Sequence, residues 1–198
     1  MSKRNAILAA ATRLFSRKGF KGTSMAELSK ATGAAGGTIF HHFKNKEDLF
    51  LNILENTKAT ILSEFAHYQK DRECRDGLEM VEGAVAFYLN LTGTLEDPFL
   101  LLHRHFPYEM AETNPVCRAC LESIYNCLLD IFEEGLRVGQ QDGSVQTLSA
   151  RNTAMVMFAM VDGIVRLNTY RIYDAGALYG SLMDACRSLL TGNGQGAP

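Results

Sequence analysis

Three side chains that can donate hydrogen bonds stand close together in the first quarter of the chain. They are His41, His42 and Lys46, and the same short run holds Thr38 and the aromatic Phe40. An imidazole or an ammonium group can bind the acceptor atoms of an anionic partner. Neighbouring residues on a helix point about 100 degrees apart, so the two histidines cannot have the same contact.

A second group with possible chemistry is the pair Cys117 and Cys120. On a helix these two sulfurs share a face, and His103 or His105 could join them as metal ligands. The alternative is two buried thiols on an apolar stripe. A single CxxC pair on a helix is neither a zinc knuckle nor a thioredoxin active site, so metal or redox sensing stays the minor alternative and no bound metal is expected.

Patterns typical of enzymes are missing from the sequence. We find no glycine-rich phosphate loop, no serine-centred nucleophile elbow and no carboxylate pair on a recognisable scaffold. We therefore expect neither an enzyme nor a resident cofactor.

The segment 24–46 predicts the elements that position these donors. Ser24 and Glu27 have the spacing of a capping box, and Gly33 can end the short helix that follows in a left-handed turn. A second helix is predicted over 38–43, with Ile39 and Phe43 facing inward. Asn45 then caps a longer helix. Two short helices joined by a tight turn are a helix-turn-helix, whose second helix can enter the major groove of DNA.

The charge of the chain is divided unevenly along it. The net charge at pH 7 is only −2, but residues 1–46 carry nine lysines and arginines against one acidic residue, a net charge of +8. The remaining residues carry eleven bases and twenty-one acids, a net charge of −10. Charge scattered over solvated helix faces would not explain this asymmetry. A basic end on an acidic body instead indicates a protein that presents that end to a polyanion.

The run GAAGGTIFHHFKNKEDLF, residues 33–50, resembles the DNA-binding signature of the TetR-like family of bacterial transcription regulators. The resemblance covers roughly the first quarter of the chain. It implies an all-α protein with a three-helix DNA-binding domain on a helical ligand-binding and dimerisation domain. We place these at residues 1–46 and 47–191, with a disordered tail at 192–198.

The resemblance also implies which residues meet the DNA. His41 has the position of a base-edge reader, His42 that of a phosphate donor, and Lys46 that of a phosphate contact at the start of the next helix. The full set of expected DNA contacts is Ser24, Gly37, Thr38, Phe40, His41, His42 and Lys46.

The reading helix departs from the family pattern at its start. Ala35 stands where a capping serine or threonine is usual, and Phe40 replaces a frequent tyrosine. Gly36 and Gly37 follow the alanine. These glycines either let the DNA backbone approach closely or form a flexible turn, and the sequence favours neither reading.

Hydrophobic periodicity predicts helices through the rest of the chain. We expect them over 3–18, 46–68, 78–91, 99–106 and 115–139, followed by two more near the C-terminus. Asn114 should cap the helix over 115–139, and Ser149 and Asp174 should cap the last two. Residues 70–76 and 140–143 are expected as a linker and a loop. Gly93 should end the third of these helices. Asp97 and Pro98 should begin the fourth, and Pro107 should interrupt it.

Aromatic, methionine and histidine residues are frequent in the middle of the chain, and most of them are expected in the core. The family resemblance adds a ligand cavity among them, suited to an apolar or aromatic small molecule. The expected ligand-binding residues are Phe65, Phe87, Tyr88, His103, Phe106, Tyr125 and Phe158.

The long helices near the C-terminus are apolar on more than one side, which indicates a surface shared with a second copy of the chain. In the resembling family such helices form a four-helix dimer interface, which places Cys127, Ile131, Met157 and Val161 near it. The expected protein is a homodimeric repressor that leaves a palindromic operator when a ligand binds.

No targeting or membrane segment is visible, and five cysteines in a chain without a secretion signal favour reduced thiols. We therefore expect a cytoplasmic protein with no membrane partner. The alternative class is a helical enzyme or carrier that has a basic N-terminal bundle.

Overall fold

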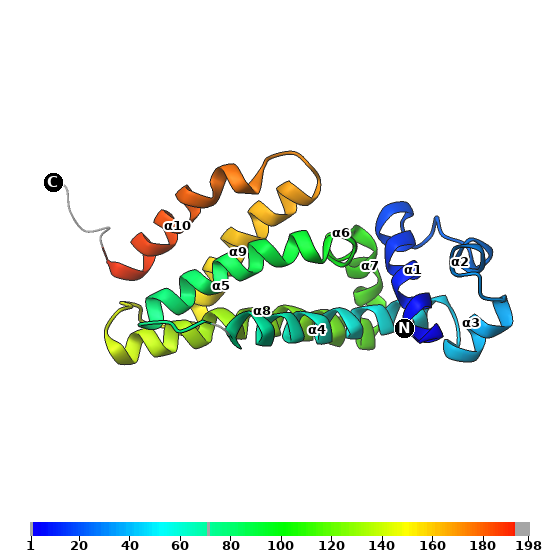
Figure 1. Ribbon diagram of the computed structural model, residues 1–198, viewed down its shortest axis with the longest axis horizontal. Coiled ribbons are helices and arrows are strands. Elements are labelled where there is room, and N and C mark those ends of the chain that lie inside the picture. The colour runs from blue at the N-terminus through cyan, green and yellow to red at the C-terminus, as the bar shows by residue number, and fades with distance from the viewer. Residues whose placement is uncertain (1, 71, 193–198) are drawn as a thin grey trace. The chain divides into compact units, whose positions relative to one another are not determined.

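The computed structural model describes residues 2–70 and 72–192, and these residues form ten helices with no strand among them (Figure 1). The all-α fold class is thereby confirmed. The helices are α1 (Lys3–Lys18), α2 (Met25–Thr32), α3 (Gly36–His42), α4 (Lys46–Lys70), α5 (Gly77–Thr94), α6 (Glu96–Leu102), α7 (His105–Thr113), α8 (Pro115–Asp142), α9 (Ala150–Thr169) and α10 (Ala175–Thr191).

The described residues divide into two compact units. We call residues 2–61 with 95–124 the N-terminal unit, and residues 62–94 with 125–192 the bundle unit. Helices α4 and α8 contribute residues to both units, so the chain passes between the units inside helices. The expected domain boundary at residue 46 is untested by this division and stays a prediction.

The N-terminal unit has its core between α1, α2, α3 and the first half of α4. Helix α1 packs against α2, α3 and α6. The largest fully buried side chains come from each of these elements: Phe15, Leu28, Ile39, Phe43, Leu49 and Phe50. The inward positions expected for Ile39 and Phe43 are thus confirmed.

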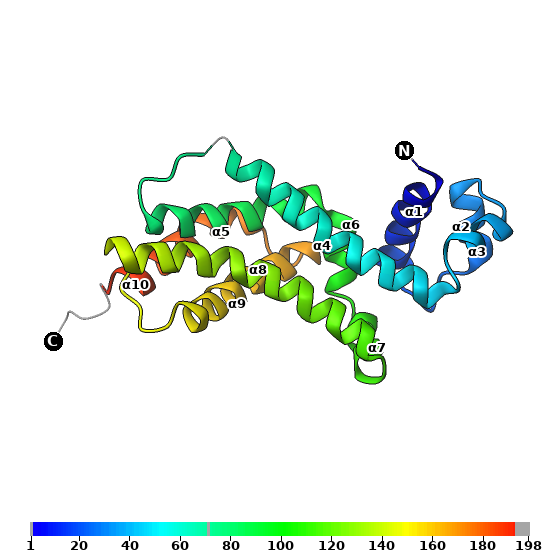
Figure 2. The same ribbon diagram turned by 90° about the horizontal axis from the view of Figure 1, so that it is seen from below.

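The bundle unit is built around α5, which packs against both α9 and α10 (Figures 1 and 2). Apolar side chains at helical spacing fill the space between them. Fully or almost fully buried members of this core are Val81, Val85, Tyr88, Met157, Val161, Leu182 and Cys186.

The predicted helix caps are present. The Asn45 side chain accepts a hydrogen bond from the Asp48 amide at 2.7 Å, and the Asn114 side chain accepts from two amides at the start of α8. Ser149 and Asp174 cap α9 and α10 in the same way. These caps satisfy amides that have no partner inside the helix.

Of the three predictions that used a proline to mark a helix boundary, the one at Pro115 is correct and the other two are wrong. Helix α6 begins at Glu96, two residues before Pro98, and Pro107 lies inside the first turn of α7. Amides in the first turn of a helix have no partner within it, so a proline costs little there. Asp97 is not an N-cap; its side chain bonds α1 instead.

Other boundaries also differ from the expectation. Helix α3 begins at Gly36 rather than Thr38 and ends at His42, and α5 continues through Gly93 to Thr94. Gly93 keeps a negative φ, so it does not form the left-handed turn that ends a helix.

Two of the long helices also run past their expected ends. Helix α4 ends at Lys70 rather than at residue 68. Helix α8 extends to Asp142, so most of the expected loop 140–143 is helical, and Gly143 takes the left-handed conformation after it. The expected disordered tail, apart from Gly192, lies outside the described residues. None of the helices is long and apolar enough to cross a bilayer, in the part of the chain that the structure describes.

Candidate nucleic-acid interface

A capping box fixes the start of α2. The Ser24 hydroxyl accepts from the Glu27 amide at 3.1 Å, and the Glu27 carboxylate accepts from the Ser24 amide at 2.9 Å. Lys18 adds an ion pair of 2.6 Å to the same carboxylate. These hydrogen bonds, that of Lys18 first, lower the pKa of Glu27 to about 2. The predicted capping box is confirmed, and it leaves the exposed Ser24 at the surface.

The turn between α2 and α3 is held by side chains of α2. Gly33 is left-handed, with φ of 64°, as predicted. The Thr32 hydroxyl donates to the Leu28 carbonyl at 2.8 Å and accepts from the Ala34 amide at 3.2 Å, and the Ser29 hydroxyl donates to the Ala34 carbonyl. The backbone leading into α3 therefore has a defined path.

Helix α3 buries one side and exposes the other. Ile39 is fully buried, while Gly37 and His41 are exposed and Phe40 keeps 53% of its surface in solvent. Thr38 and His42 are half-buried. An exposed phenylalanine beside a histidine, on a helix whose opposite side is anchored, is a surface suited to base edges and thymine methyl groups.

The start of α3 has no side-chain cap. Ala35 occupies the N-cap position and makes no side-chain hydrogen bond. The Thr38 amide donates to the Ala35 carbonyl at 2.8 Å, which leaves the amides of Gly36 and Gly37 for an outside acceptor such as a phosphate oxygen. A side chain added at Gly36 or Gly37 would meet no atom within 4 Å, so no packing inside the chain requires a glycine at either position.

Lys46 lies against aromatic rings at the start of α4. Its ammonium nitrogen is 4.4 Å from the centre of the Phe20 ring and 5.9 Å from that of Phe15. Partial burial lowers the pKa of Lys46. Attraction between a cation and a ring face favours this position.

Phe20 is itself held by a ring from α7. The Phe106 ring stacks on it at 4.0 Å with an angle of 8° between the planes, and Phe50 meets both rings edge-on. Sequence analysis assigned Phe106 to a ligand cavity and gave Phe20 no role. Their contact joins residues 86 positions apart, and no local sequence pattern predicts it.

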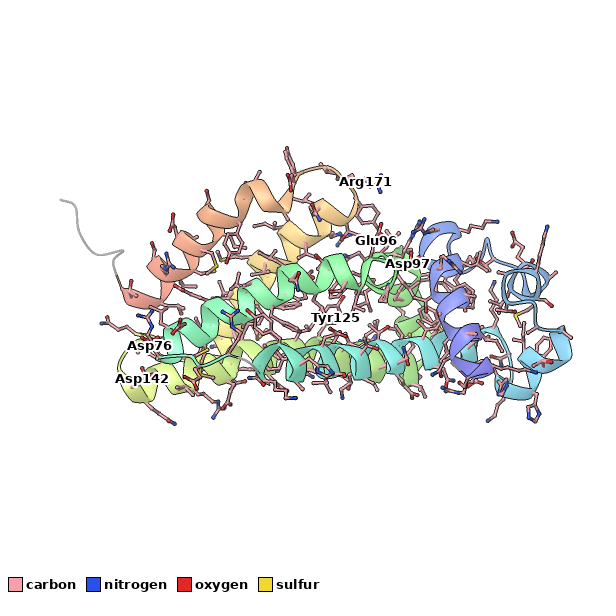
Figure 3. All side chains as sticks on the ribbon, viewed as in Figure 1. Asp76, Glu96, Asp97, Tyr125, Asp142 and Arg171 are labelled. Atoms are coloured by element: carbon pink, nitrogen blue, oxygen red, sulfur yellow. The ribbon has the colours of Figure 1, made fainter. Side chains whose placement is uncertain are left out.

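Polar contacts also tie α6 and α7 to the end of α1. Arg17 pairs with Asp97 at 3.1 Å, and Lys21 pairs with Glu109 at 2.6 Å. The Arg104 guanidinium donates to the carbonyls of Ser16 and Arg17 at 2.8 and 3.0 Å. Figure 3 shows Asp97 on the side of α6 that meets α1. We call these contacts, together with the Phe20–Phe106 stack, the α1 brace.

Five of the seven predicted ligand-binding residues lie in the bundle unit. Phe65 and Phe87 are in contact at 5.0 Å, and Phe158 contacts both Tyr88 and Tyr125 at 5.5 and 6.0 Å. The Tyr88 hydroxyl donates to Asp162 at 2.6 Å. His103 and Phe106 belong to the N-terminal unit, where His103 is buried beside Phe99. The ligand-binding assignment stays a prediction.

The four predicted dimer residues are buried within the single chain. Met157 and Val161 have no exposed surface, and Cys127 and Ile131 expose 6 and 7%. The neighbours Met155 and Val156 on α9 are each 52% exposed. If α9 meets a second copy, these neighbours are the side chains that would touch it.

Cys117 and Cys120 have the properties of packed thiols. The Cys117 thiol donates to the Pro107 carbonyl at 3.6 Å, and burial raises its pKa to about 11. Burial raises the pKa of Cys120 as well. No group of three or more histidine, cysteine, aspartate or glutamate side chains could hold a metal ion within the residues described here.

A family model matches the N-terminal part of the chain, and a known regulator matches most of it. Residues 7–53 match the model of a family described as "Bacterial regulatory proteins, tetR family". The transcriptional regulator AcrR of Shigella flexneri is 32% identical over 168 residues, which cover 82% of this chain and 76% of that protein.

Solved structures share the whole fold. A putative transcriptional regulator from Saccharomonospora viridis, in complex with choline, has a TM-score of 0.81 at 22% identity and covers 94% of this chain and 96% of its own. FadR from Bacillus subtilis, in complex with stearoyl-CoA, has a TM-score of 0.75 at 21% identity and covers 93 and 98%.

Proposed function

Because the chain belongs to the tetR family of bacterial regulatory proteins, it is a DNA-binding transcription regulator, and we propose that it is a repressor released from its operator by a small molecule. The repressor binds as a homodimer in the cytoplasm and does no enzymatic chemistry. The relatives named above are regulators.

The exposed side of α3 is the observation that supports this proposal most directly. It carries Gly37, Phe40 and His41 on a helix whose other side is buried at Ile39. The first 46 residues, which include this helix, have a net charge of +8 and supply attraction to phosphates without base preference. In this proposal His41 reads a base edge, while Ser24, Thr38 and His42 contact the sugar-phosphate backbone.

Lys46 has two alternative partners in this proposal. Without DNA its ammonium lies on the Phe20 ring, and with DNA it moves to a phosphate. The two positions compete, so the α1 brace, which holds Phe20, affects how much of the lysine is available. The expected phosphate contact is therefore retained, with a cost for leaving the ring.

The homodimer is proposed to form through exposed apolar side chains of α9 and α10 in the bundle unit. Those more than a third exposed are Met155, Val156, Leu178, Tyr179 and Leu189. The predicted residues Met157 and Val161 then support this face from within the core rather than touching the partner. A two-fold axis through the face gives two copies of α3 for successive major grooves, about 34 Å apart.

Ligand size and class differ widely among proteins of this fold. The neighbours in complex with choline and stearoyl-CoA are both less than 25% identical to this chain. The ligand of this chain therefore has to be argued from its own bundle unit. Since α4 and α8 contribute residues to both units, a change at the ligand can reach the N-terminal unit through continuous helices.

The test begins by selecting operator duplexes from a random DNA pool with the purified protein. His41→Ala should weaken operator binding by about 1–3 kcal/mol and relax the preference at one base pair per half-site. Lys46→Ala should weaken binding to operator and to random DNA alike. It should also lower, by about one unit, the steepness with which the logarithm of affinity falls with the logarithm of salt concentration.

Matched controls come from the far end of α4, where His67 and Lys70 are also exposed. His67→Ala and Lys70→Ala should leave operator affinity unchanged. If His41→Ala and Lys46→Ala bind like these controls, α3 is not the reading helix. Failure to enrich any sequence from the pool would contradict the regulator itself.

A further inference from the structure

The bundle unit contains a cavity that sequence analysis did not identify. Its volume is about 280 Å³, and it is formed by the end of α4, the residues after it, the first half of α5 and the middle of α8. Of the predicted ligand-binding residues it includes only Phe65. The lining residues are Phe65, Tyr68, Gln69, Arg72, Cys74, Met80, Gly83, Ala84, Ile131, Glu134 and Gly135.

Tyr68, which lines this cavity, carries a buried polar atom in its hydroxyl group. Its oxygen is buried and has no hydrogen-bond partner among the residues that the structure describes. Burial raises the pKa of Tyr68, so the group stays protonated and keeps a proton to donate. A buried hydroxyl without a partner is costly, which makes an acceptor atom of a bound molecule favourable at this point.

Open space near the hydroxyl is present at Gly83. A side-chain carbon at Gly83 would lie 3.9 Å from the Tyr68 oxygen and would meet no other atom within 4 Å. Gly83 is buried and lies within α5, where glycine costs helix stability relative to alanine. The missing side chain therefore leaves room on the side of the cavity that faces the hydroxyl.

The charge next to the hydroxyl is positive. The Arg72 guanidinium carbon lies 4.6 Å from the centre of the Tyr68 ring. Its positive charge acts to lower the pKa of Tyr68, so the electrostatic effect of Arg72 at this hydroxyl favours an anion. Tyr179 and Cys74 act on the pKa of Tyr68 in the opposite direction, and Glu134 lines the cavity from α8. Arg72 is thus the cation in the lining that an acceptor bound near the hydroxyl could pair with.

The other walls are apolar, with Phe65, Met80, Ala84 and Ile131 on three helices. The cavity is at the small end of the range for ligand sites, about 300–1,000 Å³. It therefore suits a molecule built on one ring or a short chain.

We propose that this cavity is the effector site, and that its ligand is a small organic acid with an apolar body. This inference rests on the proposed function and gives the ligand class that the function left open. The acid group accepts from Tyr68 and pairs with Arg72, while its ring or chain lies against Phe65 and Met80. The aromatic cluster around Tyr88 and Phe158 is then core rather than ligand site.

Three probes of equal size test the class. They are 4-butylbenzoate, 4-butylbenzyl alcohol and 4-butylbenzylamine, titrated calorimetrically into the full-length protein. The acid should bind at least tenfold more tightly than the alcohol, because it adds a charged hydrogen bond. The amine should bind no better than the alcohol. No binding of the acid at millimolar concentration, or tighter binding of the amine, would overturn the proposed class.

Variants of the lining residues test whether the acid binds in this cavity. Gly83→Leu should abolish binding by filling the cavity, and Arg72→Gln and Tyr68→Phe should each weaken the acid about tenfold. Tyr68→Phe should also raise the melting temperature of the free protein, because it removes a buried hydroxyl without a partner. A tyrosine with only a structural role would show no loss of acid affinity. The controls are Tyr173→Phe and Arg118→Gln, whose side chains are exposed and outside the cavity.

Cys74 reports occupancy independently. It lines the cavity and is exposed, whereas the other four cysteines are buried or half-buried. The acid should slow alkylation of Cys74 in the wild type and not in Gly83→Leu. Equal alkylation rates with and without acid in the wild type would place the acid elsewhere.

Operator binding distinguishes a failure of the cavity proposal from a failure of the proposed function. If the wild type binds its operator but the variants bind the acid as tightly as the wild type does, the cavity proposal fails and the proposed function is unaffected. If the wild type binds no operator, the proposed function fails whatever the acids do. Release of operator by the acid in wild type, lost in Gly83→Leu, supports both.

Discussion

Ion pairs join helices in both units, as Arg187 and Glu82 do in the bundle unit, but the two units differ at their candidate functional sites. In the N-terminal unit, Arg17, Lys21 and Arg104 reach α6, α7 or the end of α1 and bond acceptors there. In the bundle unit a hydroxyl is buried without a partner among the described residues, beside a cavity of about 280 Å³. A helix that reads DNA needs a fixed position, whereas a unit that senses a molecule needs space and unmet hydrogen bonds.

The comparison also indicates where substitution of a glycine should affect folding and where it should affect function. The glycines of α3 have open space around them, whereas an added carbon at Gly77 or Gly135, where α5 meets α8, would lie within 3 Å of backbone atoms. Substitutions should therefore act on function at the α3 glycines and on folding at Gly77 and Gly135. The predictions below test this contrast, beginning with the largest expected effect.

Gly77→Ala should cost about 2–3 kcal/mol of unfolding free energy. A side-chain carbon at Gly77 would lie 2.0 Å from the Gly139 nitrogen, at a contact between α5 and α8. Polar contacts hold the same place: the Gly77 amide donates to Asp142 at 2.8 Å, and Asp76 and Asp142 lie close together (Figure 3). Urea denaturation measures the change.

Gly180→Ala in α10 is the matched control for that glycine. No atom lies within 4 Å of the position that its added carbon would take, so helix propensity alone should act and raise stability slightly. Equal effects at Gly77 and Gly180 would mean that the close approach of α5 and α8 does not limit the bundle unit.

Phe106→Leu should cost about 1 kcal/mol, because it removes the stack on Phe20 and an edge contact to Phe50. It should weaken the α1 brace and change DNA affinity through Lys46, while affinity for an effector stays as in the wild type. A loss of effector affinity with DNA binding intact would restore the assignment of Phe106 to a ligand site. Fluorescence anisotropy with labelled operator, beside calorimetry with the effector, measures both.

These contrasts explain how far the sequence could predict the molecule. The capping box at Ser24, the left-handed Gly33 and the caps at Asn114 and Ser149 depend on residues a few positions apart, and all were predicted correctly. Helix α3 depends on the same local signals, although it begins two residues earlier than expected.

The remaining features depend on contacts that no local pattern contains. Asp97 has the sequence context of an N-cap, but its partners are Ser16 and Arg17, 81 and 80 residues away. The cavity around Tyr68 exists because Gly83 comes near it from another helix. Each can be recognised only when the packing is known.

Acid should loosen α2 through Glu27. Its folded-state pKa of about 2 is below the ordinary value of 4.5, so its stabilising effect is complete above pH 4.5 and is lost as pH falls toward 2. Glu27→Gln should flatten that part of the stability profile and leave the profile above pH 5 unchanged in slope. The carboxylate is exposed and its ion pair is screened, so the effect should be small. Thermal melts of both proteins at matched pH measure it, and parallel profiles would show that the capping carboxylate is not important for α2.

The smallest expected change in stability is at Gly37, and it decides between the two readings of the glycine pair. Gly37→Ala meets no atom within 4 Å, so it should raise stability by roughly 0.5 kcal/mol through helix propensity. If the DNA backbone approaches α3 closely at this point, the added methyl group should nevertheless lower operator affinity, giving a more stable protein that binds less well. If the pair is merely a flexible turn, ordering it should leave affinity equal or slightly higher. Gly36→Ala is the matched control, since Gly36 also has open space but is less exposed than Gly37. Operator affinities for both variants, measured at one salt concentration, distinguish the readings: a loss confined to Gly37→Ala supports close approach, and no loss in either variant removes Gly37 from the interface.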